Sequence, residues 1–198
     1  MRSREAGHKF SPENLDRLMS EERRRLTDPE RLFDMFPLAG DQVVADVGCG
    51  PGFFAIPLAR RLSKGKVYAF DVQDEMVRAA QENVASSGLA NVEAARCDES
   101  RLPLAAGTLD GAYLAFVIHE IEGSLPDYVA MLRERLKPGG WLAVVEWKRE
   151  PMEEGPPLHE RLAEHEVREI GEAGGMTFSS QADVNDKQYL VLFTNGSA

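Results

Sequence analysis

Four groups of residues that could bind a polar ligand each follow an apolar segment of the chain. In chain order they are Asp46 with Gly48, Gly50 and Gly52; Asp71; Asp98 with Glu99; and His119 with Glu120. Glycine has no side chain, so a turn rich in glycine lets a ligand approach the backbone closely. Carboxylates at neighbouring positions could accept hydrogen bonds from the same ligand. The pattern indicates a site for a nucleotide-like ligand.

These residues suit an adenosyl ligand that carries an amino-acid tail. Asp71 follows the glycines by about 20 residues, the spacing at which an acid accepts hydrogen bonds from ribose hydroxyls. Asp98 could accept a hydrogen bond from the adenine amine, and the next backbone amide, that of Glu99, could donate one to the ring. Asp46 could help to hold the ammonium of the tail, while the glycine turn lies against the sulfonium. Three adjoining residues are also expected at the ligand: Cys49, Val72 and Phe116.

Each of these residues also has a purely structural interpretation. Asp71 could cap the helix that follows it, Asp98 could belong to a turn, and the glycines could simply join a strand to a helix. Their occurrence together at the ends of consecutive predicted strands favours a binding site, because ligands bind open α/β sheets beyond the carboxyl ends of the strands.

The elements that would position these residues alternate between strand and helix. Apolar runs predict strands at 42–47, 66–71, 92–97, 109–118, 141–146, 177–183 and 188–194. Leading helices are expected to begin at Ser11 and at Thr27 and to run to about Phe36. A further helix should begin at Phe53 or Phe54, another should end at Gly88, a third should begin at Ser124, and the last should cover 160–173. This alternation predicts an α/β fold with a parallel sheet and helices on both faces. The last connection, 184–187, is too short for a parallel crossover, so the last strand should be antiparallel.

The length and composition limit the classes of protein that fit. A chain of 198 residues fits one domain, 1–198, with an N-terminal helical cover over 1–40 and a sheet core over 41–198. The net charge of −10 argues against a surface for nucleic acid or anionic lipid, and the basic run 23–25 is expected on a solvated helix face. Two cysteines form no disulfide framework, which favours a reducing cytoplasm. No apolar stretch approaches the ~20 residues of a membrane span, and the oligomeric state stays open.

The chain resembles the class I S-adenosylmethionine-dependent methyltransferases, in the broad group that includes the ubiquinone/menaquinone-biosynthesis methyltransferases. The matching segments lie between Val43 and Trp147: Asp46–Gly52, Tyr68–Asp71, Cys97-Asp98, Leu102-Pro103-Leu104 with Leu109-Asp110, and Leu136–Gly140. The resemblance implies a Rossmann-like seven-stranded sheet in the order 3-2-1-4-5-7-6 with the seventh strand antiparallel. It also implies S-adenosylmethionine as cofactor, with Gly48, Gly50 and Gly52 at its turn, Asp71 at the ribose and Asp98 at the adenine.

The residues after the predicted strands disfavour some branches of this family. N-methyltransferases that act on nucleotide bases or on glutamine carry the motif Asn/Asp-Pro-Pro-Tyr/Phe after the fourth strand. At that place, 116–120, this chain reads Phe-Val-Ile-His-Glu. Metal-dependent catechol-type enzymes carry acids after the fourth and fifth strands. Here Asp110 begins the fourth strand and only Glu146 follows the fifth, so we expect no metal. Cys49 and Cys97, both beside the predicted cofactor, leave no thiol set for arsenite.

A sulfonium methyl group is already activated, so the protein mainly has to align the acceptor and exclude water. A general base helps where the acceptor must lose a proton. His119 is the candidate base, because imidazole titrates near neutrality, although it could instead cap a helix or pack. Glu146 could orient a substrate or pair with Lys148 or Arg149. His159 and His165, in the region of the helix predicted over 160–173, are expected at the surface.

The first functional hypothesis is methyl transfer to a small-molecule acceptor, with oxygen, nitrogen, carbon and sulfur all open as the acceptor atom. An NAD(P)-linked oxidoreductase would need the third glycine of its GxGxxG fingerprint at 53, where this chain has Phe53. A protein that binds S-adenosylmethionine without turnover, such as a regulatory subunit, stays an alternative. The leading segment, with His8, Phe10 and the helix from Ser11, is expected either to cover the site or to pack on the sheet edge.

Overall fold

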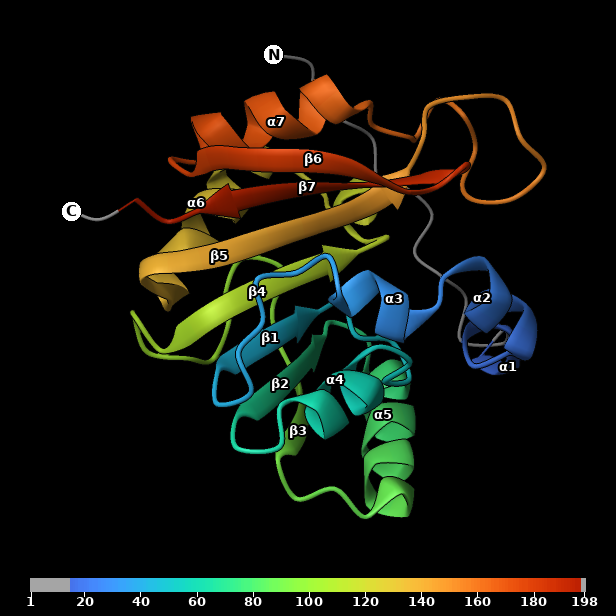
Figure 1. Cartoon of the computed structure of the whole chain (residues 1–198), viewed down its shortest axis with the longest axis vertical. Coiled ribbons are helices and arrows are strands. Elements are labelled where there is room, and N and C mark those ends of the chain that lie inside the picture. The colour runs from blue at the N-terminus through green and yellow to red at the C-terminus, as the bar shows by residue number, and fades with distance from the viewer. Residues whose placement is uncertain (1–14, 197–198) are drawn as a thin grey trace.

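A seven-stranded sheet forms the centre of the computed structural model, which describes residues 15–196 (Figure 1). The strands are β1 (Val43–Val47), β2 (Lys66–Asp71), β3 (Val92–Arg96), β4 (Leu109–Ala115), β5 (Leu136–Trp147), β6 (Thr177–Asn185) and β7 (Gln188–Thr194). Their order is β3-β2-β1-β4-β5-β7-β6. The first five strands pair in parallel, and β7 runs antiparallel to both β5 and β6. This confirms the predicted strand order and the antiparallel last strand.

Helices cover both faces of the sheet. They are α1 (Leu15–Leu18), α2 (Glu21–Leu26), α3 (Pro29–Phe33), α4 (Ala55–Arg61), α5 (Asp74–Ser87), α6 (Leu125–Arg135) and α7 (Glu164–Ala173), with one short 3-10 helix, η2 (Ile118–Glu120). One apolar core joins α3, α4 and α5 to the sheet, and a second joins α6 and α7 to its other face. In Figure 1, α5 lies beside β2 and β3, whereas α7 runs along β6 at the opposite end of the sheet.

The local signals at several helix ends act as the sequence predicts. The hydroxyl of Ser124 accepts a hydrogen bond from the backbone amide of Asp127 and caps α6. The carboxylate of Asp28 caps α3 through the amide of Glu30. Gly88, at φ 70°, ends α5 in the left-handed conformation that glycine adopts without steric cost. The helix start predicted at Ser11, with His8 and Phe10, lies outside the described residues.

The fourth strand is shorter than predicted, because Phe116 has a φ of 63° and turns the chain out of the sheet. Residues 116 and 117 are therefore not strand, and 118–120 form η2. The fifth strand is longer than predicted, because the turn at Lys137–Gly140 stays within β5 as an irregular stretch of pairing with β4. The early end of β4 places residues 116–120 at the edge of the sheet rather than inside it.

The helix predicted over 160–173 begins only at Glu164. The buried side chain of Arg161 donates hydrogen bonds to the carbonyl oxygens of Glu150, Glu154 and Pro156. These contacts keep the segment before α7 attached to the loop 151–157. His159 therefore precedes the helix and only His165 lies on it; both are exposed, as expected.

Gly111 in β4 leaves room for the buried indole of Trp141 on the neighbouring strand. A Cβ atom added at this position would lie 2.0 Å from the ring. We therefore expect Gly111→Ala to lower the free energy of unfolding by about 1–3 kcal/mol, the usual cost of overpacking a core. Chemical denaturation measures this change. Gly40→Ala is the matched control, because a Cβ there meets nothing within 4 Å; equal effects of the two substitutions would contradict the packing argument.

Candidate functional site

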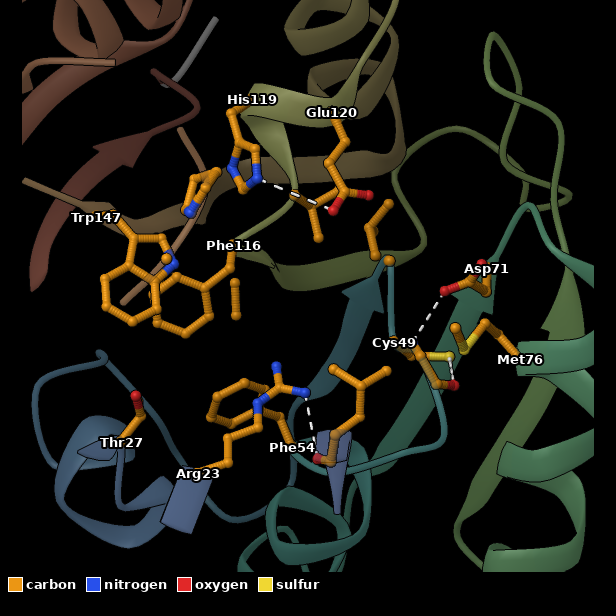
Figure 2. Close-up of a pocket in the computed structure, with 18 of the residues that line it drawn as sticks. Arg23, Thr27, Cys49, Phe54, Asp71, Met76, Phe116, His119, Glu120 and Trp147 are labelled. Atoms are coloured by element: carbon orange, nitrogen blue, oxygen red, sulfur yellow. Dashed lines mark hydrogen bonds and ion pairs between the residues drawn. The ribbon is translucent and has the colours of Figure 1, made fainter. Parts of the chain in front are cut away.

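A pocket of about 390 Å³ opens at the carboxyl ends of the central strands (Figure 2). Its wall combines the glycine turn after β1, the end of β2, the segments after β3 and β4, and the end of β5. The helices α1 and α2 and the loop 154–157 contribute further residues. The pocket therefore lies at the edge of the sheet where the sequence predicts a ligand.

Most of the predicted cofactor residues line this pocket. They are Gly48, Cys49, Gly50, Asp71, Val72, Glu99 and Phe116, and the candidate base His119 lines it as well.

The two cysteines are poor nucleophiles in this environment. Burial raises the pKa of both thiols, that of Cys97 to about 12, so the reactive thiolate form is disfavoured.

Four predicted site residues are not among the described residues that line the pocket. Asp46 and Glu146 are buried behind it. Gly52, at φ 89°, leads the chain toward α4. Asp98 is exposed and forms a short backbone bridge with Arg101. Direct contact of these residues with a cofactor stays a prediction.

The glycine turn is held by its own backbone hydrogen bonds. The amides of Gly48 and Cys49 both donate to the carbonyl oxygen of Phe70, at 2.7 and 2.9 Å. The amide of Gly50 donates to Oδ2 of Asp71 at 2.9 Å, and that of Gly52 to the carbonyl oxygen of Cys49 at 3.0 Å. The turn is therefore preformed, and these four amides are already used.

Gly48 shows why this turn needs glycine. Its φ is 78°, and a Cβ atom there would lie 2.4 Å from a methyl group of Val117. The close approach lets the segment after β4 pack directly against the turn after β1. The two walls of the pocket are thus brought together at a residue without a side chain.

Asp71 combines the structural role with a position suited to binding. Its Oδ2 holds the amide of Gly50, and its Oδ1 accepts a hydrogen bond of 3.0 Å from the amide of Gln73, the residue that precedes α5. Gln73, not Asp71, is the N-cap residue of α5, so the helix-capping interpretation of Asp71 is wrong; its carboxylate instead closes the turn that leads into the helix. A carboxylate can accept about four hydrogen bonds, so these two do not prevent Asp71 from accepting others from a ligand hydroxyl.

Asp46 is a buried carboxyl group beneath the turn. Its side chain is almost fully buried, and Oδ2 has no hydrogen-bond partner among residues 15–196. Burial raises the pKa of Asp46 to about 7; the charge of Asp71 adds to the rise, whereas Tyr113 and Arg23 oppose it. Near neutral pH, both the protonated and the ionised form of Asp46 are therefore populated.

His119 and Glu146 form a buried pair on two neighbouring strand ends. Nδ1 of His119 lies 2.7 Å from Oε1 of Glu146. The Glu146 side chain is completely buried, and its other oxygen, Oε2, accepts a hydrogen bond from the amide of Trp147. The pairings considered for Glu146 are wrong, because Lys148 pairs with Asp183 and Arg149 with Glu166. A carboxylate on Nδ1 holds the imidazole proton there and leaves Nε2 as the basic nitrogen.

The environment of His119 makes it a stronger base than an ordinary histidine. Burial alone lowers its pKa, but the charge and hydrogen bond of Glu146, with contributions from Glu120 and Glu160, raise the pKa above the ordinary value of 6.5. Nε2 lies 3.9 Å from the carboxylate of Glu120 (Figure 2). The ring also lines the pocket, so it has the position and the basicity to accept a proton from a bound molecule.

Aromatic rings form the apolar part of the pocket wall. Phe116 contacts Trp147 at a centroid distance of 5.5 Å and Phe54 at 6.3 Å. The positive φ of Phe116 directs its ring to this position (Figure 2). Phe53 and Tyr113 are buried in the core. Trp147 was missed as a pocket residue, although its place directly after the predicted strand 141–146 was a usable signal.

Arg23 departs from the expected solvated helix face. Its guanidinium carbon lies 4.7 Å from the centroid of the Phe53 ring and 5.4 Å from that of Phe54, and the side chain lines the pocket. Its neighbours Arg24 and Arg25 are exposed, as predicted. The sequence carries no local signal that separates Arg23 from the other two.

Two further searches cover the described part of the chain. Within residues 15–196, no set of three or more His, Cys, Asp or Glu side chains is placed to hold a metal ion. Over the same range, no helix has the length and apolarity that a membrane crossing requires. The prediction of a metal-free site stays a prediction.

Comparison with known proteins identifies the sequence family. Residues 44–140 match a family described as a methyltransferase domain. A demethylmenaquinone methyltransferase from Geobacillus kaustophilus is 30% identical over 105 residues, which are 51% of this chain and 43% of the relative. A ubiquinone/menaquinone biosynthesis C-methyltransferase from Bordetella parapertussis is 34% identical over 107 residues, or 54% of this chain and 41% of the relative. The chain thus spans less than half the length of these curated relatives.

Solved structures extend the match over almost the whole chain. A [4+2]-cyclase, 17% identical with a TM-score of 0.76, covers 88% of this chain and 81% of its own, and shows the fold alone. A methyltransferase from Aquifex aeolicus is 37% identical with a TM-score of 0.90, and covers 94% of this chain and 99% of its own. Together with the matched domain, the last similarity shows that the chain belongs to the S-adenosylmethionine-dependent methyltransferases.

Proposed function

We propose that the protein binds S-adenosylmethionine in the pocket at the strand ends and transfers its methyl group to a small-molecule acceptor. The observation that carries the proposal is the convergence of a preformed glycine turn, Asp71 and the His119–Glu146 pair on one pocket. In this arrangement Asp71 would hold the ribose hydroxyls and the turn would lie against the amino-acid tail. Asp98, with the amide of Glu99, would hold the adenine.

The state of the glycine turn argues against the oxidoreductase alternative. A dinucleotide places its pyrophosphate on backbone amides at the turn before the helix. Here the amides of Gly48, Cys49, Gly50 and Gly52 are all used within the turn and at the end of β2. In addition, the buried ring of Phe53 occupies the position of the third glycine of the dinucleotide fingerprint.

The His119–Glu146 pair supports a role in proton transfer. When bound, the cofactor supplies a methyl group that its positive sulfur already activates. Nε2 of His119 accepts the proton of the acceptor as the new bond to the methyl carbon forms and the carbon–sulfur bond breaks. The negative charge of Glu146 stabilises the resulting imidazolium, which later releases the proton to water. Glu146 thus acts as a positioning residue rather than a substrate contact.

The pocket wall supports an apolar acceptor with an acidic proton. Phe54, Phe116 and Trp147 offer flat apolar surfaces beside the imidazole and exclude water. The relatives named as demethylmenaquinone and ubiquinone/menaquinone biosynthesis methyltransferases agree with a small acceptor of this kind. The fold by itself is compatible with other chemistry, since the [4+2]-cyclase shares it.

An activity assay separates methyl transfer from binding of the cofactor alone. Methyl transfer should form S-adenosylhomocysteine with one or more members of a panel of phenols and enols. A cytoplasmic location remains a prediction from the sequence.

Titration calorimetry tests the ligand directly. We expect the protein to bind S-adenosylmethionine and S-adenosylhomocysteine but not NAD. Asp71→Ala should weaken this binding by about 1.5–3 kcal/mol, because hydrogen bonds to a charged acceptor are lost. Asp74→Ala is the control, since Asp74 is an exposed acid of α5 that pairs with Arg96. Binding of NAD, or an unchanged affinity in the Asp71 variant, would contradict the assignment.

The role of Glu146 can be measured without knowing the acceptor. Nuclear magnetic resonance of the His119 ring should give a pKa above 6.5, and Glu146→Gln should lower that pKa, because the variant lacks the stabilising charge. The neutral ring is the base, so turnover should rise as pH rises through this pKa, and the rise should move to lower pH in the variant. His159→Ala, at an exposed histidine, should change neither quantity. A His119 pKa that Glu146→Gln leaves unchanged would contradict the coupling.

Asp46 gives a separate test of the end of the site where the amino-acid tail of the cofactor would lie. Its pKa of about 7 means that at pH 7 about half of the free molecules carry a proton there. The cofactor ammonium favours the ionised form, so binding at pH 7 should release a fraction of a proton, and binding at pH 9 should release none from this group. Calorimetry in buffers of different ionisation enthalpy measures the release. Asp46→Asn should remove this part of it; an equal release in the variant would argue against an ammonium site at Asp46.

A further inference from the structure

We infer that Arg23 of α2 binds the carboxylate of the cofactor's amino-acid tail. This inference rests on the proposed function and adds a residue from the N-terminal helices to the cofactor site. Its basis is the position of the guanidinium, the absence of a carboxylate partner for it among the described residues, and the lack of other groups at this end of the pocket that could hold an anion.

The position of Arg23 follows from α2. Ser20 caps this helix and accepts a hydrogen bond from the amide of Arg23. The side chain extends over the rings of Phe53 and Phe54, which come directly after the glycine turn. In Figure 2, the guanidinium points from α2 into the pocket in front of Phe54. It therefore lies at the end of the site that adjoins the turn, where the tail of the cofactor would lie.

The contacts of Arg23 with residues 15–196 leave most of its guanidinium donors available. Its one hydrogen bond through the guanidinium within residues 15–196 goes from Nη1 to the carbonyl oxygen of Leu18, at 3.2 Å. No carboxylate of the described residues lies within ion-pair distance, although Asp46 and Glu120 are near enough to favour its charge. A guanidinium has five N–H donors arranged to hold a carboxylate in two parallel hydrogen bonds. Burial of such a cation is costly unless an anion compensates it.

Other groups that could hold the carboxylate are few. The amides of the glycine turn are used internally, so the turn offers no anion-binding loop. The arginines of the described pocket wall are Arg17 and Arg23, and Arg17 is exposed on α1; His119, the remaining basic group of the wall, is paired with Glu146. The rest of the charged wall is acidic: Glu22, Asp71, Glu99, Glu120, Glu154 and Glu160. An anionic group therefore finds its favourable position at Arg23.

The helix that carries Arg23 is held in place at its C-terminal end. The hydroxyl of Thr27 donates to Oε1 of Gln188 at 2.8 Å, and Nδ2 of Asn185 donates to the carbonyl oxygen of Leu26 at 2.9 Å. These bonds tie α2 to the β6–β7 hairpin, more than 150 residues away in the chain. The guanidinium is thus presented to the pocket from a fixed element, which lowers the entropic cost of binding.

The test compares two ligands that differ only in the carboxylate: S-adenosylmethionine and decarboxylated S-adenosylmethionine. Calorimetry on the full chain should show that Arg23→Met weakens binding of the first by about 10- to 100-fold, the range for charge-assisted hydrogen bonds. Binding of the decarboxylated ligand should change less than about twofold, since it makes no such bonds. Arg23→Lys should lose less than Arg23→Met, because it keeps the charge. Arg25→Met, an exposed arginine of the same helix, should bind both ligands as the parent does.

Other results would overturn the inference in distinguishable ways. If Arg23→Met weakens both ligands equally, Arg23 supports the pocket without contacting the carboxylate. If Arg17→Met, and not Arg23→Met, produces the ligand-dependent loss, the assignment to Arg23 is wrong. If the parent protein binds neither ligand, the proposed function fails and the inference fails with it.

Discussion

The hydrogen bonds between the glycine turn and the end of β2 determine the shape of the pocket. The carbonyl oxygen of Phe70 accepts two amides of the turn and the carboxylate of Asp71 accepts a third. These bonds close the turn at positive φ values that only glycine adopts without strain. They also use the N–H groups that a phosphate would need. The same contacts therefore preform the turn and leave its amides unavailable to a phosphate.

Buried charge is the second constraint on this site. Glu146 is completely buried, and its cost is reduced by the contacts with His119 and the amide of Trp147. Asp46 lacks such compensation at one oxygen, and its pKa is accordingly raised to about 7. In the same low-dielectric environment, Glu146 has two hydrogen-bond partners, whereas Oδ2 of Asp46 has none among residues 15–196.

The pocket is completed by elements far from the glycine turn in the sequence. The helix α2 is held against the β6–β7 hairpin and brings Arg23 over the rings that follow the turn. The aromatic wall depends on Phe116, whose left-handed backbone ends β4 early. One fold can serve different chemistry through the segments around its site, and a [4+2]-cyclase shares the fold of this chain.

The sequence by itself determined the strands, their alternation with helices, the antiparallel last strand and the glycine turn, because apolar periodicity, glycine and proline positions and loop length act over short stretches of chain. Most of the cofactor residues that it indicated do line the pocket. Only the tertiary structure decided that His119 meets Glu146, 27 residues later, and that Arg23 faces the pocket while Arg25 faces solvent. These outcomes depend on how distant elements pack, and no local pattern records that packing.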